Sequence, residues 1–309
     1  MSFKYKLKRI LLLGISLVMI AMVLGGCSKF SDTGAYSEFK GNISFDNEIT
    51  GRLSEDFGYE IKDLQSNLSV KEDIKPLNNK TLGWGILRSP DNKPPKADPG
   101  APELLSKYGG FYLGDTSKKE VYLTFDEGYE NGYTPKILDV LRDNNVKAVF
   151  FITGPYLKGH QDLVTRMVEE GHEVGNHTIN HPSLPEVDDK RIEEEILGLD
   201  KIFNEIFGKH MTYLRPPKGE FSERTLSISQ RLGYTNLFWS FAYEDWHRDR
   251  VRGPDYAKNI VMRNIHNGAI ILLHAVSKDN AEALDSIIKS ARENGYEFGN
   301  INNLCKKAP

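Results

Sequence analysis

Short apolar runs alternate with segments of helical periodicity from residue 120 to the C-terminus. The apolar runs fall at 120–125, 148–152, 172–175, 212–215, 235–239, 269–274 and 296–299. Their lengths suit buried strands, and the six segments between them repeat apolar residues at the spacing of a helix face. The pattern therefore predicts seven strands that alternate with six helices.

Residues that begin and end helices stand at the borders of these segments. Pro135 suits a first helical turn, Asp188 and Ser222 suit N-caps, and C-terminal caps are expected at Gly171, Gly208, Gly233 and Gly295. Strand–helix alternation of this kind predicts a parallel α/β fold, either a closed barrel or an open doubly wound sheet. No glycine-rich phosphate loop follows the first strand, so a nucleotide-binding fold has no support.

The first 26 residues have the layout of a secretory signal. Basic residues between Lys4 and Arg9 precede an apolar stretch, Ile10 to Leu24, and two glycines lead to Cys27. The sequence Leu24-Gly-Gly-Cys27 resembles the lipobox of bacterial lipoproteins. It implies a signal peptide at 1–26 and a lipidated Cys27 that tethers the protein to the extracytoplasmic face of the membrane. The alternative is an uncleaved signal-anchor helix, which also places the body outside the cytoplasm.

Three further segments follow this signal. Residues 27–82 are polar, with scattered apolar positions, and are expected to form a tether. Residues 83–118 contain Trp84, Phe111 and a proline-rich stretch, and are expected to pack on the barrel as an N-terminal extension. Residues 119–305 form the predicted catalytic domain.

Charge and cysteine content narrow the possible partners. The 309-residue chain has a net charge of −3, and removal of residues 1–26 takes away four bases and no acids, which leaves −7. An acidic body without basic runs argues against nucleic acid as a partner. Cys27 and Cys305 are the two cysteines, so a lipidated Cys27 leaves no intramolecular disulfide.

Polar clusters follow the predicted strands where each one ends. Asp126 and Glu127 come after the first strand, and His177 and His181 come after the third. The i, i+4 spacing aims both imidazoles at one point if they lie on a helical turn, whereas Pro182 makes a tight loop equally compatible. Two histidines and a carboxylate at neighbouring strand ends are the ligand types of a metal site with open positions.

Three more strand ends carry candidate chemistry. Arg215 precedes two prolines after the fourth strand, where its guanidinium can pair with a carboxylate. The loop after the fifth strand is rich in aromatic residues suited to stacking on a sugar and contains Asp245 and Trp246, and His274 ends the sixth strand. Each feature alone has an ordinary structural explanation, but strand ends of a parallel barrel meet at one rim, so together they predict a single site.

The order of these motifs resembles that of the polysaccharide deacetylases, the NodB-homology or carbohydrate esterase family 4 group. The residues that carry the resemblance are Thr124-Phe-Asp-Glu-Gly128, His177-Thr-x-x-His181, Arg215-Pro-Pro-x-Gly219, Asp245-Trp246 and Leu272-Leu-His274. Five further segments resemble the muramic-δ-lactam-forming deacetylases of spore-forming bacteria: 83–85, 108–114, 127–133, 221–226 and 274–283. The similarity extends from about residue 83 to the C-terminus.

The resemblance implies a distorted (β/α)7 barrel and one divalent metal ion, with zinc expected and cobalt or manganese as alternatives. It implies these roles: Asp126 as general base, His274 as general acid, Arg215 holding Asp126, Asp245 tuning His274, and Glu127, His177 and His181 as metal ligands. Residues expected to bind substrate are Trp246, Leu272, Lys218 and Tyr129, with Leu272 lining the pocket for the acetyl methyl group.

The sequence departs from the family pattern at two positions. The family's second acid is usually Asp where this chain has Glu127, and Ala242 replaces an acid commonly seen in the fourth motif. The expected reaction is hydrolysis of N-acetyl groups on N-acetylmuramic acid of peptidoglycan, on the way to muramic-δ-lactam in spore cortex and after an amidase has acted. The alternatives are an N-acetylglucosamine deacetylase acting on peptidoglycan or another glycan, and a glycan-binding lipoprotein without catalytic activity.

Overall fold

The computed structural model describes residues 77–305, with the side chain of Cys305 excluded. The predicted signal peptide, the lipidated Cys27 and residues 27–76 of the predicted tether lie outside the described residues. Within the described part, no helix is both long enough and apolar enough to cross a bilayer.

Seven parallel strands form the central sheet of the described domain. In chain order they are β4 (Glu120–Glu127), β5 (Ala148–Ile152), β6 (Glu173–Asn176), β7 (Tyr213–Leu214), β9 (Thr235–Asn236), β10 (Ile270–His274) and β11 (Glu297–Phe298). Their spatial order is β10-β4-β5-β6-β7-β9, and β11 also pairs with β4. Each apolar run that the sequence marked as a strand overlaps one of them, which confirms the predicted alternation.

The segment after β9 returns to β10 and makes the sheet an irregular barrel. Phe241 forms an isolated parallel bridge with Ile271, and the backbone N–H of Leu272 donates to the Phe241 carbonyl over 2.8 Å. The backbone N–H of Ser240 donates to the Ile270 carbonyl over 2.9 Å. The distorted barrel expected from the resemblance is therefore confirmed, and the open doubly wound alternative is not found.

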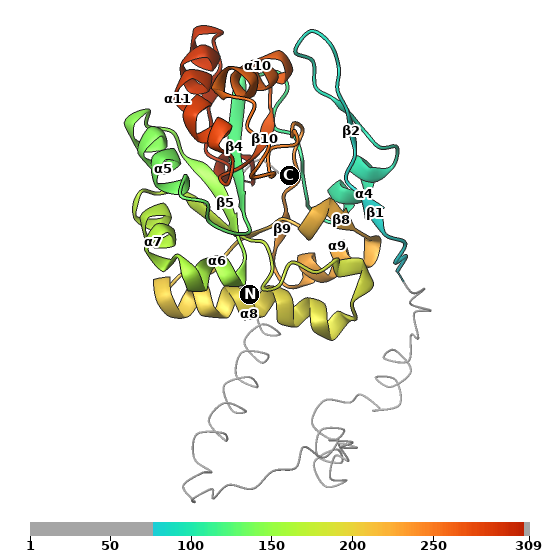
Figure 1. Cartoon of the computed structure of the whole chain (residues 1–309). Helices are drawn as coiled ribbons and strands as arrows, with labels where there is room; N and C mark the ends of the chain where they lie inside the picture. The colour runs from blue at the N-terminus through green and yellow to red at the C-terminus, as the bar shows by residue number, and fades with distance from the viewer. Residues whose placement is uncertain (1–76, 306–309) are drawn as a thin grey trace, which may run out of the picture. The chain divides into compact units, whose positions relative to one another are not determined.

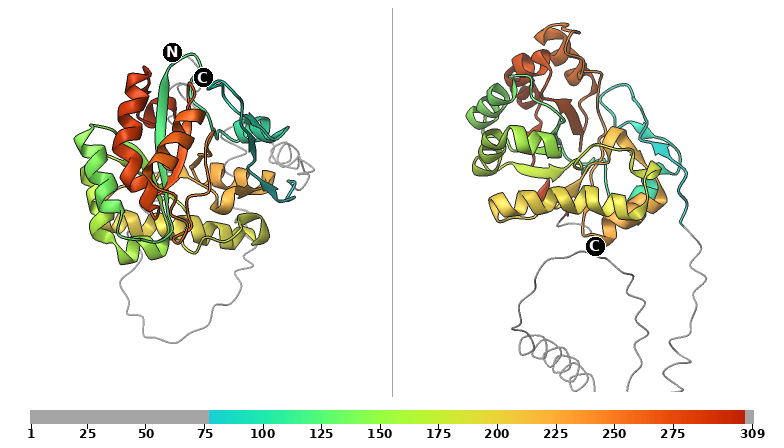
Figure 2. Two further views of the ribbon diagram at one scale, coloured as in Figure 1. Left: turned by 45° about the horizontal axis from the view of Figure 1, so that its top comes forward. Right: turned by 60° about the horizontal axis from the view of Figure 1, so that its bottom comes forward.

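Helices cover the outside of this sheet (Figures 1 and 2). They are α5 (Thr134–Asp143), α6 (Gly154–Gly159), α7 (Gln161–Glu169), α8 (Asp189–Phe207), α9 (Glu223–Arg231), α10 (Pro254–Asn264) and α11 (Lys278–Glu293). Asp188 and Ser222 cap α8 and α9 as predicted, because each side chain accepts a backbone N–H of the first turn. The second predicted helix is divided into α6 and α7 at His160, whose backbone leaves helical geometry.

The alternation of side chains along β4 decides which residues face the barrel interior. Val121, Leu123 and Phe125 belong to the core between the sheet and the helices. Tyr122 points the other way, into a smaller apolar cluster inside the barrel. Because successive side chains of a strand alternate between faces, Asp126 shares the interior face with Tyr122, and the next residue returns to the helix side.

The N-terminal extension is attached to the barrel through a short strand pair and an aromatic cluster. Strand β1 (Leu82–Gly83) pairs antiparallel with β8 (Glu220–Phe221), directly after the 3-10 turn Pro217–Gly219. Trp84 packs with residues of the extension and of the barrel in one buried cluster. The extension also contains the hairpin β2 (Ile86–Leu87) and β3 (Lys96–Ala97), and the helix α4 (Ala101–Lys107).

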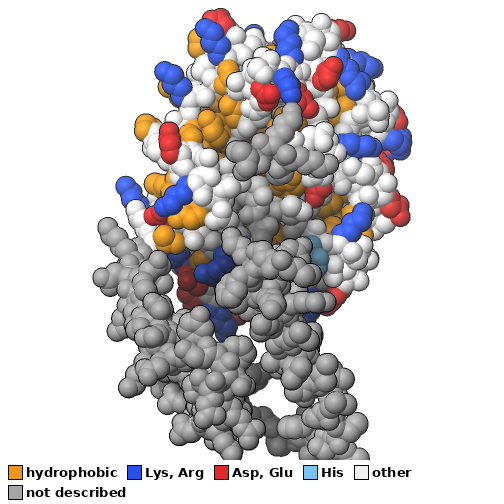
Figure 3. Space-filling model, turned by 180° about the vertical axis from the view of Figure 1, so that it is seen from behind, with side chains coloured by type: hydrophobic (Ala, Val, Ile, Leu, Met, Phe, Trp, Pro, Cys, Tyr) orange, Lys and Arg blue, Asp and Glu red, His pale blue; other side chains and the backbone are white. Residues whose placement is uncertain are grey.

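Charged side chains of both signs lie mixed on the face opposite to the view of Figure 1. Figure 3 shows Lys and Arg side chains next to Asp and Glu there, with apolar side chains between them.

Candidate active site

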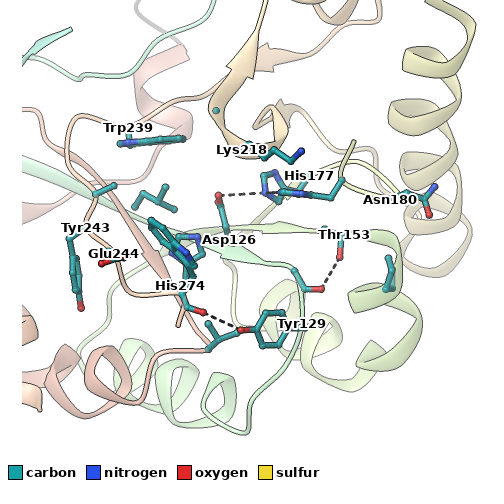
Figure 4. A pocket seen from close by; sticks show the side chains of 18 of the residues that line it. Asp126, Tyr129, Thr153, His177, Asn180, Lys218, Trp239, Tyr243, Glu244 and His274 are labelled. Carbon is teal, nitrogen blue, oxygen red and sulfur yellow. Dashed lines mark hydrogen bonds and ion pairs between the residues drawn. The ribbon is translucent and has the colours of Figure 1, made fainter. Parts of the chain in front are cut away.

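A cavity of about 900 Å³ opens at the carboxyl ends of the strands. Among the predicted site residues, those that line it are Asp126, Tyr129, His177, His181, Lys218, Trp246, Leu272 and His274. Figure 4 shows Asp126 and His274 near its centre, with His177 on one side of Asp126, Lys218 close to His177, and Trp239 above Asp126 in this view. The rim of a parallel barrel thus brings together residues that are up to 148 positions apart in the chain.

Asp126 is held by a fully buried arginine. Arg215 follows β7, and its Nη1 donates to Oδ1 of Asp126 over 2.7 Å. The same guanidinium donates from Nε to the Leu237 carbonyl and lies 4.1 Å from the ring centre of Phe151. These contacts fix the plane of the guanidinium, so that its Nη1 points at the carboxylate.

This pairing keeps Asp126 ionised. Burial by itself would raise the pKa of the Asp126 carboxyl, but the charges of Arg215, His177 and His274 outweigh burial and hold that pKa below its ordinary value. The carboxylate is 7% exposed and its second oxygen, Oδ2, lies 3.6 Å from Nε2 of His177. Asp126 is therefore an anionic proton acceptor at the edge of the cavity.

His274 is paired with a carboxylate through the ring nitrogen Nδ1. Nδ1 of His274 lies 2.6 Å from Oδ1 of Asp245, whose side chain is fully buried, and the His274 backbone N–H donates to Oδ2 over 2.8 Å. Burial would lower the pKa of His274, but Asp245 and then Asp126 outweigh burial and raise that pKa above 6.5. With Nδ1 occupied by Asp245, Nε2 is the nitrogen left for the cavity, where the exposed Trp246 ring packs edge-on 5.5 Å away.

His177 and His181 face each other with their Nε2 atoms 3.2 Å apart. Two imidazoles that bind one tetrahedral metal at about 2.0–2.1 Å hold their nitrogens about 3.3 Å apart, so the pair fits two positions of such a site. Nδ1 of His177 lies 2.8 Å from the Arg215 carbonyl, which requires N–H there and leaves Nε2 unprotonated. Burial lowers the pKa of both side chains, that of His181 to about 4, which favours the unprotonated imidazole that a metal requires.

The histidines lie on a tight loop rather than a helical turn. Thr178 and His181 both adopt positive φ, 67° and 57°. This backbone conformation is costly for Thr178, because its side chain is β-branched. The side chains of Asn176 and Thr178 accept the N–H groups of Thr178 and His181, and the buried Glu195 of α8 accepts the N–H of Asn180 over 2.7 Å. Of the two conformations compatible with the spacing, the structure has the loop, which Pro182 favours.

The structure does not bring Glu127 to the histidine pair. Its side chain is fully buried and absent from the cavity lining, and neither carboxylate oxygen has a hydrogen-bond partner among residues 77–305. It follows Asp126 on β4 and faces the helix side, where it lies close enough to Tyr156 and Glu130 to interact electrostatically. Burial raises the pKa of Glu127 well above 4.5, and Glu130 and Asp126 add to this rise. Its role as a metal ligand stays a prediction without geometric support.

No group of three or more His, Cys, Asp or Glu side chains within residues 77–305 is arranged as a metal site. The donor set that fits a divalent ion consists of the two imidazoles, and the predicted third ligand lies behind the strand. Tetrahedral zinc sites with an open position normally use three protein ligands. The assignment of His177, His181 and Glu127 as metal ligands therefore stays a prediction, for which the spacing of the two imidazoles is the geometric support.

Two bases near the cavity have no acidic partner among the described residues: Lys218, which lines the cavity, and Arg248, which stacks on the lining residue Tyr129. The guanidinium of Arg248 lies 4.1 Å from the ring centre of Tyr129. Two further bases after Trp246 in the chain, Arg250 and Arg252, both pair with Glu244. Lys218 itself adopts positive φ, 60°, between Pro217 and Gly219, so the turn holds it at the wall of the cavity. The hydroxyl of Tyr129 donates to the Trp246 carbonyl over 3.2 Å.

Some functional positions were missed by sequence reasoning. Glu195 holds the histidine loop from a helix, and the indole N–H of Trp84 donates to the Trp239 carbonyl over 2.9 Å. Asn280 donates to Asp245 over 2.6 Å. The segments 83–85 and 274–283 contained two of these residues, but a sequence resemblance alone does not say what each side chain contacts. Nothing in the chain pattern marked Glu195.

Comparisons with known proteins agree with this geometry. The family model described as polysaccharide deacetylase matches residues 113–237. The chain is 45% identical over 227 residues to the peptidoglycan-N-acetylmuramic acid deacetylase PdaA of Bacillus subtilis. The aligned region covers 73% of this chain and 86% of that protein. It is 34% identical over 198 residues to a peptidoglycan-N-acetylglucosamine deacetylase of Bacillus cereus, over 63% of this chain and 71% of that one.

Solved structures extend the likeness to the fold. The structure of Bacillus subtilis PdaA, a family 4 carbohydrate esterase, matches with a TM-score of 0.73 at 44% identity and covers 75% of this chain and 99% of that chain. A family 4 pseudoenzyme from Bacillus anthracis matches with a TM-score of 0.60 at 32% identity, over 63% of this chain and 68% of that one. The barrel, the order of its motifs and these relatives together show that the chain belongs to the polysaccharide deacetylases, the family 4 carbohydrate esterases.

Proposed function

We propose that this protein hydrolyses the N-acetyl group of N-acetylmuramic acid residues in peptidoglycan. One observation carries the proposal: a carboxylate paired with Arg215 and an imidazole paired with Asp245 both border one cavity at the barrel rim. Amide hydrolysis needs a base for the attacking water and an acid for the departing amine. The two groups are set apart in pKa by different partners, as acid and base pairs are in enzymes that work near neutral pH.

Asp126 is suited to take the proton of the attacking water. Its carboxylate borders the cavity and is ionised, while Arg215 fixes its orientation. The pairing with Arg215 makes the carboxylate a weaker base than a free one, but it keeps the deprotonated form present at neutral pH. Leu272, which is nearly buried in the same cavity, offers an apolar contact to the acetyl methyl group.

His274 is suited to return a proton to the sugar nitrogen. Its protonated state is favoured by Asp245, and its Nε2 is free of protein partners that the structure records. Water adds its oxygen to the acetyl carbon, the C–N bond breaks, and the amine leaves with the proton from His274. The products are acetate and a sugar with a free 2-amine.

Family 4 esterases generally depend on a divalent metal ion, and we propose zinc here, with cobalt or manganese able to replace it. His177 and His181 would hold the ion, because their Nε2 atoms are spaced for a shared metal. When bound, such an ion polarises an amide carbonyl and lowers the pKa of water. The positive charge of that ion would also stabilise the neighbouring Asp126 carboxylate as the anion.

Two observations support N-acetylmuramic acid over N-acetylglucosamine as the substrate: the named relatives, and basic residues near the cavity. The more similar of the two named relatives acts on N-acetylmuramic acid. Muramic acid differs from glucosamine by a lactyl group, which has a free carboxylate once an amidase has removed the peptide stem. Among the described residues, Lys218 in the cavity lining and Arg248 on the lining Tyr129 have no acidic partner and are suited to bind that carboxylate, whereas Arg250 and Arg252 pair with Glu244. The released amine and the lactyl carboxylate then lie on one sugar, which favours closure to a δ-lactam.

The test is acetate release by the full-length chain, loaded with Zn²⁺, from peptidoglycan before and after treatment with an N-acetylmuramoyl-L-alanine amidase. We expect acetate and muramic-δ-lactam from the amidase-treated material and little from the untreated material. Equal release from both, or release from glucosamine only, would contradict the muramate assignment and favour the glucosamine deacetylase. No release from either would favour a glycan-binding protein without catalysis, as the likeness to a pseudoenzyme allows.

We also propose that Cys27 is lipidated and holds the protein at the extracytoplasmic face of the membrane, with action on spore cortex. The support is the signal layout of residues 1–26 and the lipobox-like sequence before Cys27. Two or three acyl chains anchor a protein firmly, whereas a single chain does not. Mass spectrometry of the N-terminal peptide of the protein from cells should find a diacylglyceryl-modified Cys27. An intact N-terminus that still contains Met1 would contradict this.

A further inference from the structure

Asn280 is a buried amide that contacts the acid pair from behind. It lies in the first turn of α11 with 1% exposure and was not among the predicted site residues. Its Nδ2 donates to Oδ2 of Asp245 over 2.6 Å and to the His274 carbonyl over 3.2 Å. One side chain therefore contacts both members of the pair that forms the proposed acid.

The direction of this amide is fixed by a tyrosine. The hydroxyl of Tyr243 donates to Oδ1 of Asn280 over 2.5 Å, and burial raises the pKa of Tyr243, so the hydroxyl keeps its proton. With the amide oxygen occupied by Tyr243, the amide N–H₂ group must point at Asp245, which as a carboxylate can only accept. The backbone N–H of Asn280 also bonds to Oγ of Ser277, the N-cap of α11, and this anchors the turn.

The carboxylate of Asp245 is thereby held on both oxygens. Oδ1 faces Nδ1 of His274, while Oδ2 accepts from the His274 backbone and from Asn280. Without the amide, Oδ2 keeps one donor from the protein, and the carboxylate can rotate about its last torsion. Rotation would weaken the bond to Nδ1, and that bond sets the tautomer and the aim of the imidazole.

We propose that Asn280, backed by Tyr243, is a positioning residue that holds Asp245 in the plane required to orient His274 for proton donation. The proposal rests on the proposed function, because it assigns the acid role to His274. Asn280 does not line the cavity, so it acts through Asp245 and not by contact with the sugar.

A matched control is available on another helix, away from the cavity. Asn144, the C-cap of α5, donates from Nδ2 to the Asp285 carboxylate over 3.0 Å and to the Val140 carbonyl over 2.9 Å. Its bonds are of the same chemical kind as those of Asn280, one to a carboxylate and one to a carbonyl. It lies outside the cavity lining, so Asn144→Leu reports the effect of losing such bonds away from the site.

The experiment compares Asn280→Leu with Asn144→Leu in the full-length, Zn²⁺-loaded chain, using acetate release from amidase-treated peptidoglycan over a range of pH. For Asn280→Leu we expect kcat to fall about 10- to 100-fold with KM unchanged, which is less than the roughly 10²–10⁴-fold that a general acid contributes. The alkaline limb of the pH profile should move as well. The groups that face His274 and set this limb are Asp126 on β4, Arg215 after β7 and Asp245 itself. Asn144→Leu should leave both readouts unchanged.

A second readout does not depend on turnover. In ¹⁵N-histidine-labelled protein, the Nδ1 proton of His274 should give a low-field resonance that Asn280→Leu shifts or broadens and Asn144→Leu preserves. If Asn280→Leu does not fold, Asn280→Ala, which also removes the amide donor, should show the same changes. Tyr243→Phe should show them to a smaller degree.

The outcomes separate the two hypotheses. Wild-type protein that releases no acetate from this substrate would contradict the proposed function, and the resonance then decides the role of Asn280 alone. An active wild type in which Asn280→Leu matches Asn144→Leu in kcat, pH profile and resonance would overturn the positioning role while leaving the proposed function standing.

Discussion

The buried pair of Arg215 and Asp126 offers a sharp test of how the site is held. We consider Arg215→Met, Asp126→Asn and the double variant. Arg215→Met keeps the apolar stem but removes the guanidinium that contacts Asp126 at 2.7 Å and the Leu237 carbonyl at 3.0 Å. The carboxylate that remains is 7% exposed and has no other arginine or lysine partner within the described residues.

The expected free-energy changes follow from this burial. Removing one partner of a buried pair costs about 3–5 kcal/mol, because the other charge stays in a poorly solvated place. Asp126→Asn should cost less, about 1.5–3 kcal/mol, since the amide oxygen can still accept from Arg215. The double variant leaves no carboxylate without its partner, so it should be about 0.5–3 kcal/mol more stable than the sum of the single changes implies.

The assay is urea unfolding of all four proteins at pH 7, with the free energy of unfolding extrapolated to water and the m-value checked for constancy. The control cycle uses the exposed pair Arg231 and Glu193, 3.0 Å apart, as Arg231→Met and Glu193→Gln, with an expected coupling of about 0.2–1 kcal/mol. Additivity of the buried cycle within about 0.5 kcal/mol would refute the reasoning, because it would mean that Asp126 does not depend on Arg215 for its charge.

Three further predictions concern other parts of the site. His274 works as an acid only while protonated, so activity falls as pH rises past its pKa; Asp245→Asn removes the carboxylate that raises that pKa, and the fall in the pH profile of kcat should move to lower pH. Burial raises the pKa of Glu127, so folding stability should be lost as pH rises toward that pKa, and Glu127→Gln should remove this pH dependence from urea titrations. Zn²⁺ affinity measured by calorimetry should be unchanged in Glu127→Gln and lost in His177→Ala. Trp84→Phe removes the indole N–H bonded to the loop after β9, which should cost about 1 kcal/mol in unfolding and raise KM more than it lowers kcat.

The strands and most of the site could be predicted from the sequence because both follow short-range rules. The run 148–152 is a strand with the predicted limits, and Asp188 and Ser222 cap helices where their position suggested. Parallel strands carry their carboxyl ends to one rim, so Asp126 and His274 could be placed together although they are far apart in sequence.

The remaining features depend on directions that a linear pattern does not contain. Glu127 matches a motif position, but strand alternation places its carboxylate on the helix side of β4. Lys218, Arg250 and Arg252 are all basic residues, and only the folded structure shows that Arg250 and Arg252 pair with Glu244. Asn280 is recognisable only once α11 is packed behind the acid pair, because its partner is 35 residues away.

The measurement that tests the central claim most directly is tandem mass spectrometry of disaccharides released from amidase-treated glycan strands after incubation with the full-length, Zn²⁺-loaded protein. Fragmentation assigns each lost acetyl group to one of the two sugars, and the Asp126→Asn variant supplies the background. The account predicts loss of acetyl from the muramic residue, with δ-lactam formed on the same sugar, and none above background from the variant. Acetyl loss confined to glucosamine, or equal loss with wild type and Asp126→Asn, would contradict it.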